Sequence, residues 1–128
     1  MPCSCDVDPV AFAVPDSLRE CTPKSADAAT ICPRCLVVQS AAGTPADGDF
    51  SRVNDAFPDG DAGVALALAL GLLDSLARNR SEIQTALDAV ARDGADPLLA
   101  IDRLLDDPAV QPAIDLERRR VQLESLLY

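Results

Sequence analysis

The chain has 128 residues, a net charge of −10 at pH 7 and an apolar content of 48%. This length is sufficient for one domain, or for one domain with a small appendage. Because only 3% of the residues are aromatic, the core must consist of Leu, Val, Ile and Ala, which favours packed helices over a β-sandwich. The acidic charge argues against nucleic acid or an anionic membrane as a partner.

The types of charged residue are more informative than the net charge. The chain has 17 Asp against 4 Glu, and 10 Arg against a single lysine, Lys24. This composition is similar to that of proteins from salt-adapted archaea. Salt of about 1 M shortens the screening length to 3 Å, so that a dense acidic surface becomes tolerable. In such organisms most proteins are acidic, so the acidic charge argues only weakly against binding to nucleic acid.

The sequence also bears on the compartment. Residues 1–6 lack the basic and apolar regions of a signal peptide. The longest uncharged apolar run, residues 62–73, is shorter than the roughly 20 residues that cross a bilayer, and it predicts a buried helix. We therefore expect a cytoplasmic protein, in which cysteines are metal ligands more often than disulfides.

Residues 1–40 contain all five cysteines and the clearest strand patterns. Residues 10–14 alternate large and small side chains between two prolines, which predicts a short strand. Ser17 and Glu20 have the spacing of a capping box and predict a single helical turn. Residues 29–31 and 36–39 flank the last cysteine pair, and we expect them to form the two arms of a hairpin.

Residues 41–60 have the Gly, Pro and Asp content of a linker. Within it, Phe50, Val53 and Phe57 recur at helical spacing, and Asp49 precedes them as a possible cap. This pattern predicts a docking turn that packs on one of the neighbouring domains.

Residues 61–128 are predicted to form four helices joined by short loops. The first begins at Asp61 and extends to Ala77, and the last extends from about 114 to 127. Between them, helix starts are indicated by Ser81 with Gln84, by Asp96 before Pro97, and by Asp107 before Pro108. Helix ends are indicated by Gly94 and Pro112.

The five cysteines predict a metal site. They are Cys3 and Cys5, separated by one residue, then Cys21, then Cys32 and Cys35 around Pro33 and Arg34. A Cys-Pro-x-Cys pair between strands is typical of a zinc knuckle, whose turn directs both sulfurs at one point. Two such pairs give tetrahedral sulfur coordination at about 2.3 Å per bond. A structural Zn²⁺ also explains how a segment of this size can fold.

The favoured ligand set is Cys3, Cys5, Cys32 and Cys35. Cys21 is the alternative ligand in place of Cys3 or Cys5, because the first pair has one intervening residue where a standard knuckle has two. The chain has no histidine, so any other ligand must be a carboxylate such as Asp6. The whole chain is then predicted to be α+β, with a zinc ribbon of short β-hairpins over residues 1–40, a linker over 41–60 and a four-helix domain over 61–128, each domain with its own core.

A family resemblance accompanies these motifs. The first cysteine pair followed by residues 8–16, then residues 31–36, 94–104 and 116–120, resembles an uncharacterised haloarchaeal family of small zinc-ribbon proteins. The resemblance covers nearly the whole chain. It implies a metal-binding ribbon with a C-terminal helical domain and no assigned activity, and the one-residue spacing of the first cysteine pair departs from its pattern.

Other charged motifs have a structural interpretation. Residues 118–120 are three arginines, which can contact phosphates but also have i+3 and i+4 partners in Glu117 and Glu124 on one helix face. The carboxylate pairs Asp106–Asp107 and Asp47-x-Asp49 fit a helix cap and a solvated loop. Without histidine, no Ser-His or Cys-His nucleophile can form, and sulfur-only zinc leaves no open position for water. We therefore predict no catalytic residues and no enzyme activity.

Three functions are consistent with these features. The first is a structural zinc ribbon that serves as a protein-interaction or regulatory module, with protein partners and neither a membrane nor a small-molecule substrate. The second is a thiol-redox or metal-handling protein that uses Cys32 and Cys35. The third is a nucleic-acid-binding ribbon, which residues 118–120 would serve.

Overall fold

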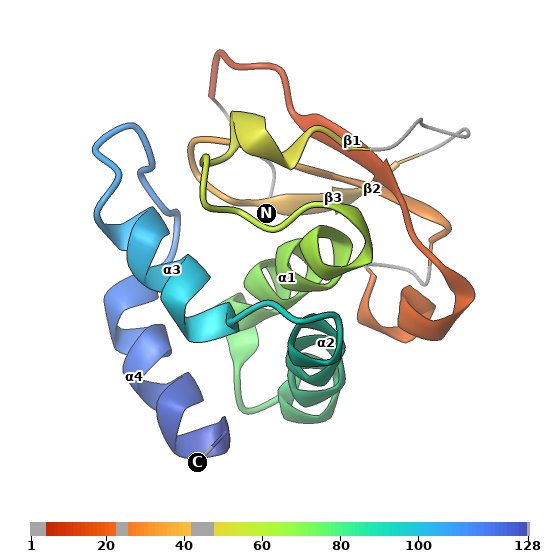
Figure 1. Cartoon of the computed structure of the whole chain (residues 1–128). Helices are drawn as coiled ribbons and strands as arrows, with labels where there is room; N and C mark the ends of the chain where they lie inside the picture. The colour runs from red at the N-terminus through yellow and green to blue at the C-terminus, as the bar shows by residue number, and fades with distance from the viewer. Residues whose placement is uncertain (1–4, 23–25, 42–47, 128) are drawn as a thin grey trace.

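The computed structural model describes residues 5–22, 26–41 and 48–127 (Figure 1). A three-stranded sheet precedes four α-helices, which confirms the predicted α+β fold class. In chain order the elements are β1 (Val10–Ala13), η1 (Asp16–Cys21), β2 (Ala28–Ile31), β3 (Val38–Ser40), η3 (Phe50–Arg52), α1 (Gly60–Leu72), η4 (Leu73–Ser75), α2 (Arg80–Arg92), α3 (Pro97–Leu105) and α4 (Leu116–Leu127). No helix in these described ranges has the length and hydropathy to cross a membrane.

The sheet is an antiparallel meander in the order β1-β2-β3. Phe12 of β1 is opposite Ala29 of β2, and Ile31 of β2 is opposite Val38 of β3. Along β1 the side chains alternate between buried and exposed, as the sequence pattern predicts. The predicted hairpin around the second cysteine pair is confirmed, because β2 and β3 are its arms.

Helix α1 is the centre of the fold. Its residues from Ala62 to Leu70 are all buried, and a helix that is apolar on every side needs cover on every side. The sheet covers α1 through β3, while α2 and η1 contact it elsewhere. Figure 1 shows α1 between the sheet and α2, with α3 and α4 packed together to one side.

The predicted docking turn is present and contributes to this core. Phe50, Val53 and Phe57 are all buried. The ring of Phe50 lies 5.3 Å from that of Phe12 in β1 and 5.4 Å from that of Phe57, centroid to centroid, within the range of favourable aromatic pairs. The turn therefore packs on the sheet through the contact of Phe50 with Phe12.

The expectation of separate cores is wrong. One hydrophobic cluster includes Val10 and Ile31 of the sheet, Phe50 of the turn, and Leu66 and Leu123 of the helices. The helix α1 has no polar face to turn toward solvent, so the sheet must complete its burial. The boundaries at 40/41 and 60/61 stay a prediction.

Two helix ends follow the local signals of the sequence. Asp96 caps α3 with its Oδ1 accepting from the backbone N–H groups of Leu98 and Leu99, each at 3.1 Å. Gly94 adopts a φ of +90° just after α2, a conformation that favours glycine.

Three predicted starts are wrong. The helix α1 has Asp59, not Asp61, at its N-cap and ends at Leu72 before a 3₁₀ turn. The N-cap of α2 is Asn79, whose side chain donates to the Leu72 carbonyl oxygen at 3.1 Å. Asp107 begins a turn in place of a helix, since its Oδ1 accepts from the N–H of Ala109.

Candidate metal centre

The second cysteine pair lies in the turn between β2 and β3. The backbone N–H of Cys32 donates to the Val37 carbonyl and that of Leu36 donates to the Cys32 carbonyl, both at 3.0 Å. Inside this closed turn, the N–H groups of Arg34 and Cys35 donate to the Sγ of Cys32 at 3.4 and 3.5 Å. Donors aimed at a sulfur favour its thiolate form, which is the form that binds metals.

Leu36 has a strained backbone. Its φ of +64° makes it the only non-glycine residue with a positive φ in the described ranges. The left-handed conformation costs a residue with a Cβ about 1–2 kcal/mol. The side chain of Leu36 is buried in the core, so packing holds the turn in the conformation that lets two N–H groups reach one sulfur.

The structure brings Cys5 to this turn. The Sγ atoms of Cys5, Cys32 and Cys35 all lie within 4.8 Å of one another. Tetrahedral zinc with bonds of about 2.3 Å places its sulfurs about 3.8 Å apart, so a small inward movement of the side chains suffices. Cys32 is buried, while Cys5 and Cys35 are half-buried. These three residues can hold a metal ion.

The other predicted ligands are Cys3, Cys21 and Asp6. Cys3 lies outside the described residues. Cys21 does not belong to the cluster: it is buried between η1 and α2, and its Sγ donates to the Glu82 carbonyl at 3.4 Å. Burial, with help from the charges of Glu20 and Glu82, raises the pKa of Cys21 to about 11. Asp6 is exposed and is not part of the sulfur cluster.

Sequence reasoning missed two backbone contacts to the cysteine turn of the candidate metal centre. The N–H of Gln111 donates to the carbonyl of Arg34 at 2.6 Å, and the N–H of Ala113 donates to the carbonyl of Cys35 at 3.0 Å. Gln111 and Ala113 belong to the segment between α3 and α4, far from the cysteines in the sequence. No periodicity or spacing relates the two segments, so nothing in the sequence could have indicated this contact.

The arginine run has mainly structural contacts. Arg120 of α4 forms a bidentate pair with Asp102 of α3, with N–O distances of 2.8 and 3.1 Å. It also pairs with Glu124, as the i+4 spacing predicts. The guanidinium of Arg119 donates to Gln122. The pair with Asp102 attaches α4 to α3, whereas the contacts with Gln122 and Glu124 lie within α4. Arg118 is the arginine of the run whose guanidinium makes no hydrogen bond or ion pair within the described ranges.

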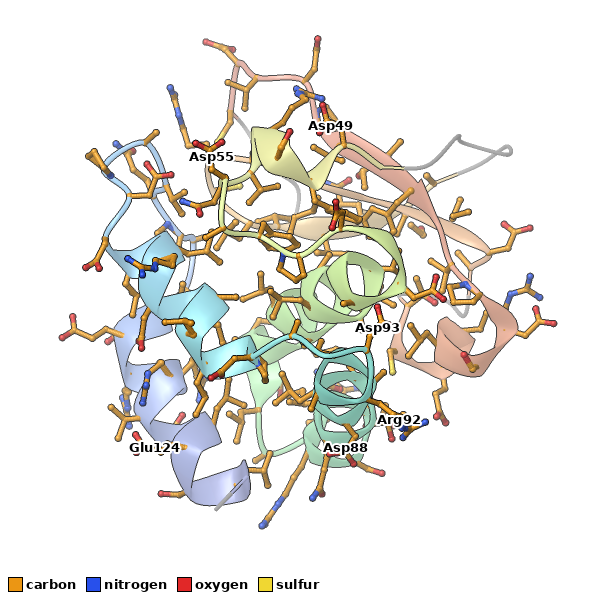
Figure 2. All side chains as sticks on the ribbon, in the orientation of Figure 1. Asp49, Asp55, Asp88, Arg92, Asp93 and Glu124 are labelled. Atoms are coloured by element: carbon orange, nitrogen blue, oxygen red, sulfur yellow. The ribbon has the colours of Figure 1, made fainter. Side chains whose placement is uncertain are left out.

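The carboxylate pairs also have structural contacts. Asp107 accepts from the side chain of Asn54 at 2.9 Å in addition to its turn bond. Asp49 accepts from the Ser51 hydroxyl, and Asp47 lies outside the described residues. Figure 2 shows acidic side chains such as Asp49 and Glu124 distributed over the outside of the molecule. Within the described ranges, no three of these carboxylates lie close enough together to hold a metal ion.

Comparison with known proteins gives one match. Residues 2–127 match the family of unknown function DUF6276. The chain belongs to this family. No curated protein and no solved structure shows significant similarity to it. The expectation of an uncharacterised family is confirmed, and this DUF6276 protein has a cysteine cluster able to hold a metal ion.

Proposed function

We propose that this DUF6276 protein is a structural zinc protein in which Cys3, Cys5, Cys32 and Cys35 bind one Zn²⁺. The zinc-bound hairpin then serves as a protein-interaction or regulatory module without enzyme activity. The observation that carries the proposal is the convergence of three sulfurs within 4.8 Å, in a turn whose N–H groups donate to the sulfur of Cys32.

The choice of zinc follows from the donor set. Sulfur-only sites with tetrahedral geometry favour zinc or iron–sulfur clusters, and a closed Cys₄ site is typical of structural zinc. Cys3 is two residues from Cys5, so it is the nearest sulfur in the sequence that can complete the set. A closed site supplies no open position for substrate, and this supports a role without catalysis.

The test is metal content, measured by native mass spectrometry and elemental analysis on protein purified in high salt without added zinc. We expect one zinc per chain in the wild type and in Cys21→Ser, and loss of zinc in Cys32→Ser and Cys35→Ser. Cys21→Ser is a matched control because its sulfur lies outside the cluster. Equal loss from Cys21→Ser and Cys32→Ser contradicts the ligand set, and a wild type without metal contradicts the zinc proposal.

The interaction role is supported by the structural contacts of the charged motifs in the described residues: Asp96 caps α3, Asp107 begins a turn, and Arg120 pairs with Asp102. It predicts association with a protein partner or with a second copy. A chain that stays monomeric in native mass spectra, and recovers no partner at high salt, contradicts this part of the proposal.

A thiol-redox role is the second candidate, and the proximity of Cys32 and Cys35 favours it. It predicts a Cys32–Cys35 disulfide that forms reversibly at a cellular potential. Thiol titration of the metal-loaded protein decides between the two, because bound zinc protects both sulfurs. If both stay protected and yield no disulfide, the redox role fails.

We further propose an adaptation to high salt and a cytoplasmic location. Both are supported by the composition: 17 Asp and one Lys in a chain of net charge −10, and cysteines that must stay reduced to bind zinc. Salt screens the repulsion within an acidic surface. The thermal midpoint should therefore rise steadily with KCl to molar concentrations, and a midpoint independent of salt contradicts the adaptation.

A further inference from the structure

The segment before α4 pairs in the manner of a strand with the cysteine turn between β2 and β3, residues 32–37, named here the knuckle. Gln111 and Ala113, two residues apart, donate to the carbonyls of Arg34 and Cys35 at 2.6 and 3.0 Å. Alternate residues of an extended segment direct their N–H groups to the same side. Pro112 lies between the two donors, at the position that needs no N–H, so the sequence of this segment suits the pairing.

Both ends of the segment are fixed in the core. Val110 is 7% exposed and Leu116 is 2% exposed. Near the end of the segment, the Oδ1 of Asp115 accepts from the N–H of Arg118 at 3.1 Å, in the first turn of α4. Residues 110–116 therefore connect the backbone of a cysteine ligand to the start of a helix.

Side chains from several segments meet at the same place. A small cavity of about 60 Å³ lies between the knuckle, α1 and residues 110–116, and its lining includes Cys35, Val38, Leu70, Ile114 and Leu116. Because the cavity is small, a displacement of the knuckle would open a gap beside Ile114 and Leu116. These two side chains would then have to move into the gap or lose their packing contacts.

We propose that residues 110–116, named here the α4 latch, are the outer support of the metal centre, so that metal binding and the docking of α4 stabilise each other. This inference rests on the proposed zinc site. The metal fixes the sulfur of Cys35 and thereby its carbonyl, which accepts from the latch. Linkage is reciprocal, so a latch that is docked must in turn strengthen metal binding.

The first experiment is hydrogen exchange on the full chain, zinc-loaded and after removal of zinc by a chelator. We expect the amides of Gln111 and Ala113, and the first turn of α4, to exchange about 10-fold faster without zinc. The helix α2 is the internal control, because its contacts are with α1, η1 and α3. Unchanged exchange in the latch, or an equal increase in α2, overturns the inference.

The second experiment measures zinc affinity by competition with a chelator in Gln111→Pro and Gln111→Ala. Both variants remove the glutamine side chain, but only proline removes the donor to Arg34. We expect Gln111→Pro to bind zinc about 10–100-fold more weakly, as for other outer-layer partners of metal ligands, and Gln111→Ala to match the wild type. Equal affinity in all three overturns the latch and leaves the zinc site intact. A wild type that binds no zinc removes the zinc site and the latch together.

Discussion

Gly71 of α1 lies directly against Val38 of β3. A Cβ added to Gly71 would be 2.5 Å from the Cβ of Val38 and 2.8 Å from its Cγ2, closer than real side chains approach. The sheet can therefore rest on α1 at this point only because residue 71 has no side chain. The same strand begins just after the turn that holds Cys32 and Cys35, so this contact also positions the candidate metal centre against the helix.

Gly71→Ala should destabilise the protein by about 1–2 kcal/mol. The expected cost of overpacking is about 1–3 kcal/mol, and the better helix propensity of alanine offsets up to about 1 kcal/mol of it. Chemical denaturation measures the difference. In a Val38→Gly background the clash is gone, so there Gly71→Ala should be neutral or stabilising; the same loss in both backgrounds would show that the contact is not the cause.

Leu36 offers a test of backbone strain, because glycine should be more stable than alanine at this position. Leu36→Ala and Leu36→Gly both remove a buried side chain, and each should cost several kcal/mol, within the range of about 2–5 known for core leucines. At a φ of +64°, however, glycine avoids the penalty that alanine keeps. We expect Leu36→Gly to be more stable than Leu36→Ala by about 1 kcal/mol in urea unfolding. The opposite order would mean that the turn relaxes to a negative φ.

Arg120 should be more important for stability than its neighbours in the arginine run. Arg120→Lys keeps the charge but loses the bidentate geometry with Asp102, so its thermal midpoint should fall. Arg118→Lys is the matched control and should leave the midpoint unchanged. A double-mutant cycle of Arg120→Lys with Asp102→Asn should show positive coupling; additive losses would mean that the pair contributes nothing of its own.

Cys21 should make stability depend on pH at the alkaline end. Burial raises the pKa of this thiol from 9.0 to about 11, so the unfolded chain releases its proton first. Its contribution is complete below pH 9 and is lost as the pH rises toward about 11. Thermal midpoints from pH 8 to 11 should fall more steeply for the wild type than for Cys21→Ala. Parallel curves for the two proteins would contradict the shift.

Local signals predicted local structure well. The alternation around Phe12 indicated β1, the Cys-Pro-x-Cys pair indicated the β2–β3 turn, and Asp96 with Pro97 indicated the start of α3. Each of these depends on residues within one turn or one strand. The capping prediction for α2 failed at Asn79, whose side chain donates to the Leu72 carbonyl at the end of α1.

The candidate site could be anticipated in part. Spacing favoured Cys3, Cys5, Cys32 and Cys35, with Cys21 as the alternative to Cys3 or Cys5. The structure brings Cys5, Cys32 and Cys35 together, and Cys3 lies outside the described residues. Spacing did not decide between these sets. It could not place Cys21, because burial between η1 and α2 follows from packing that no cysteine pattern records. Nor could it indicate that Ala113 donates to Cys35, because backbone contacts between distant segments leave no trace in residue type.

The helix α1, buried on every side from Ala62 to Leu70, has a consequence for how this chain can be divided. Residues 1–40 expressed alone would lack the helix on which the sheet rests. Residues 61–128 expressed alone would expose the apolar side of α1 that β3 and the Phe50 turn cover, and would tend to aggregate. The hairpin that holds the cysteine cluster therefore cannot be transplanted alone between proteins, and fragments of this chain are poor substitutes for the whole in a search for its partners.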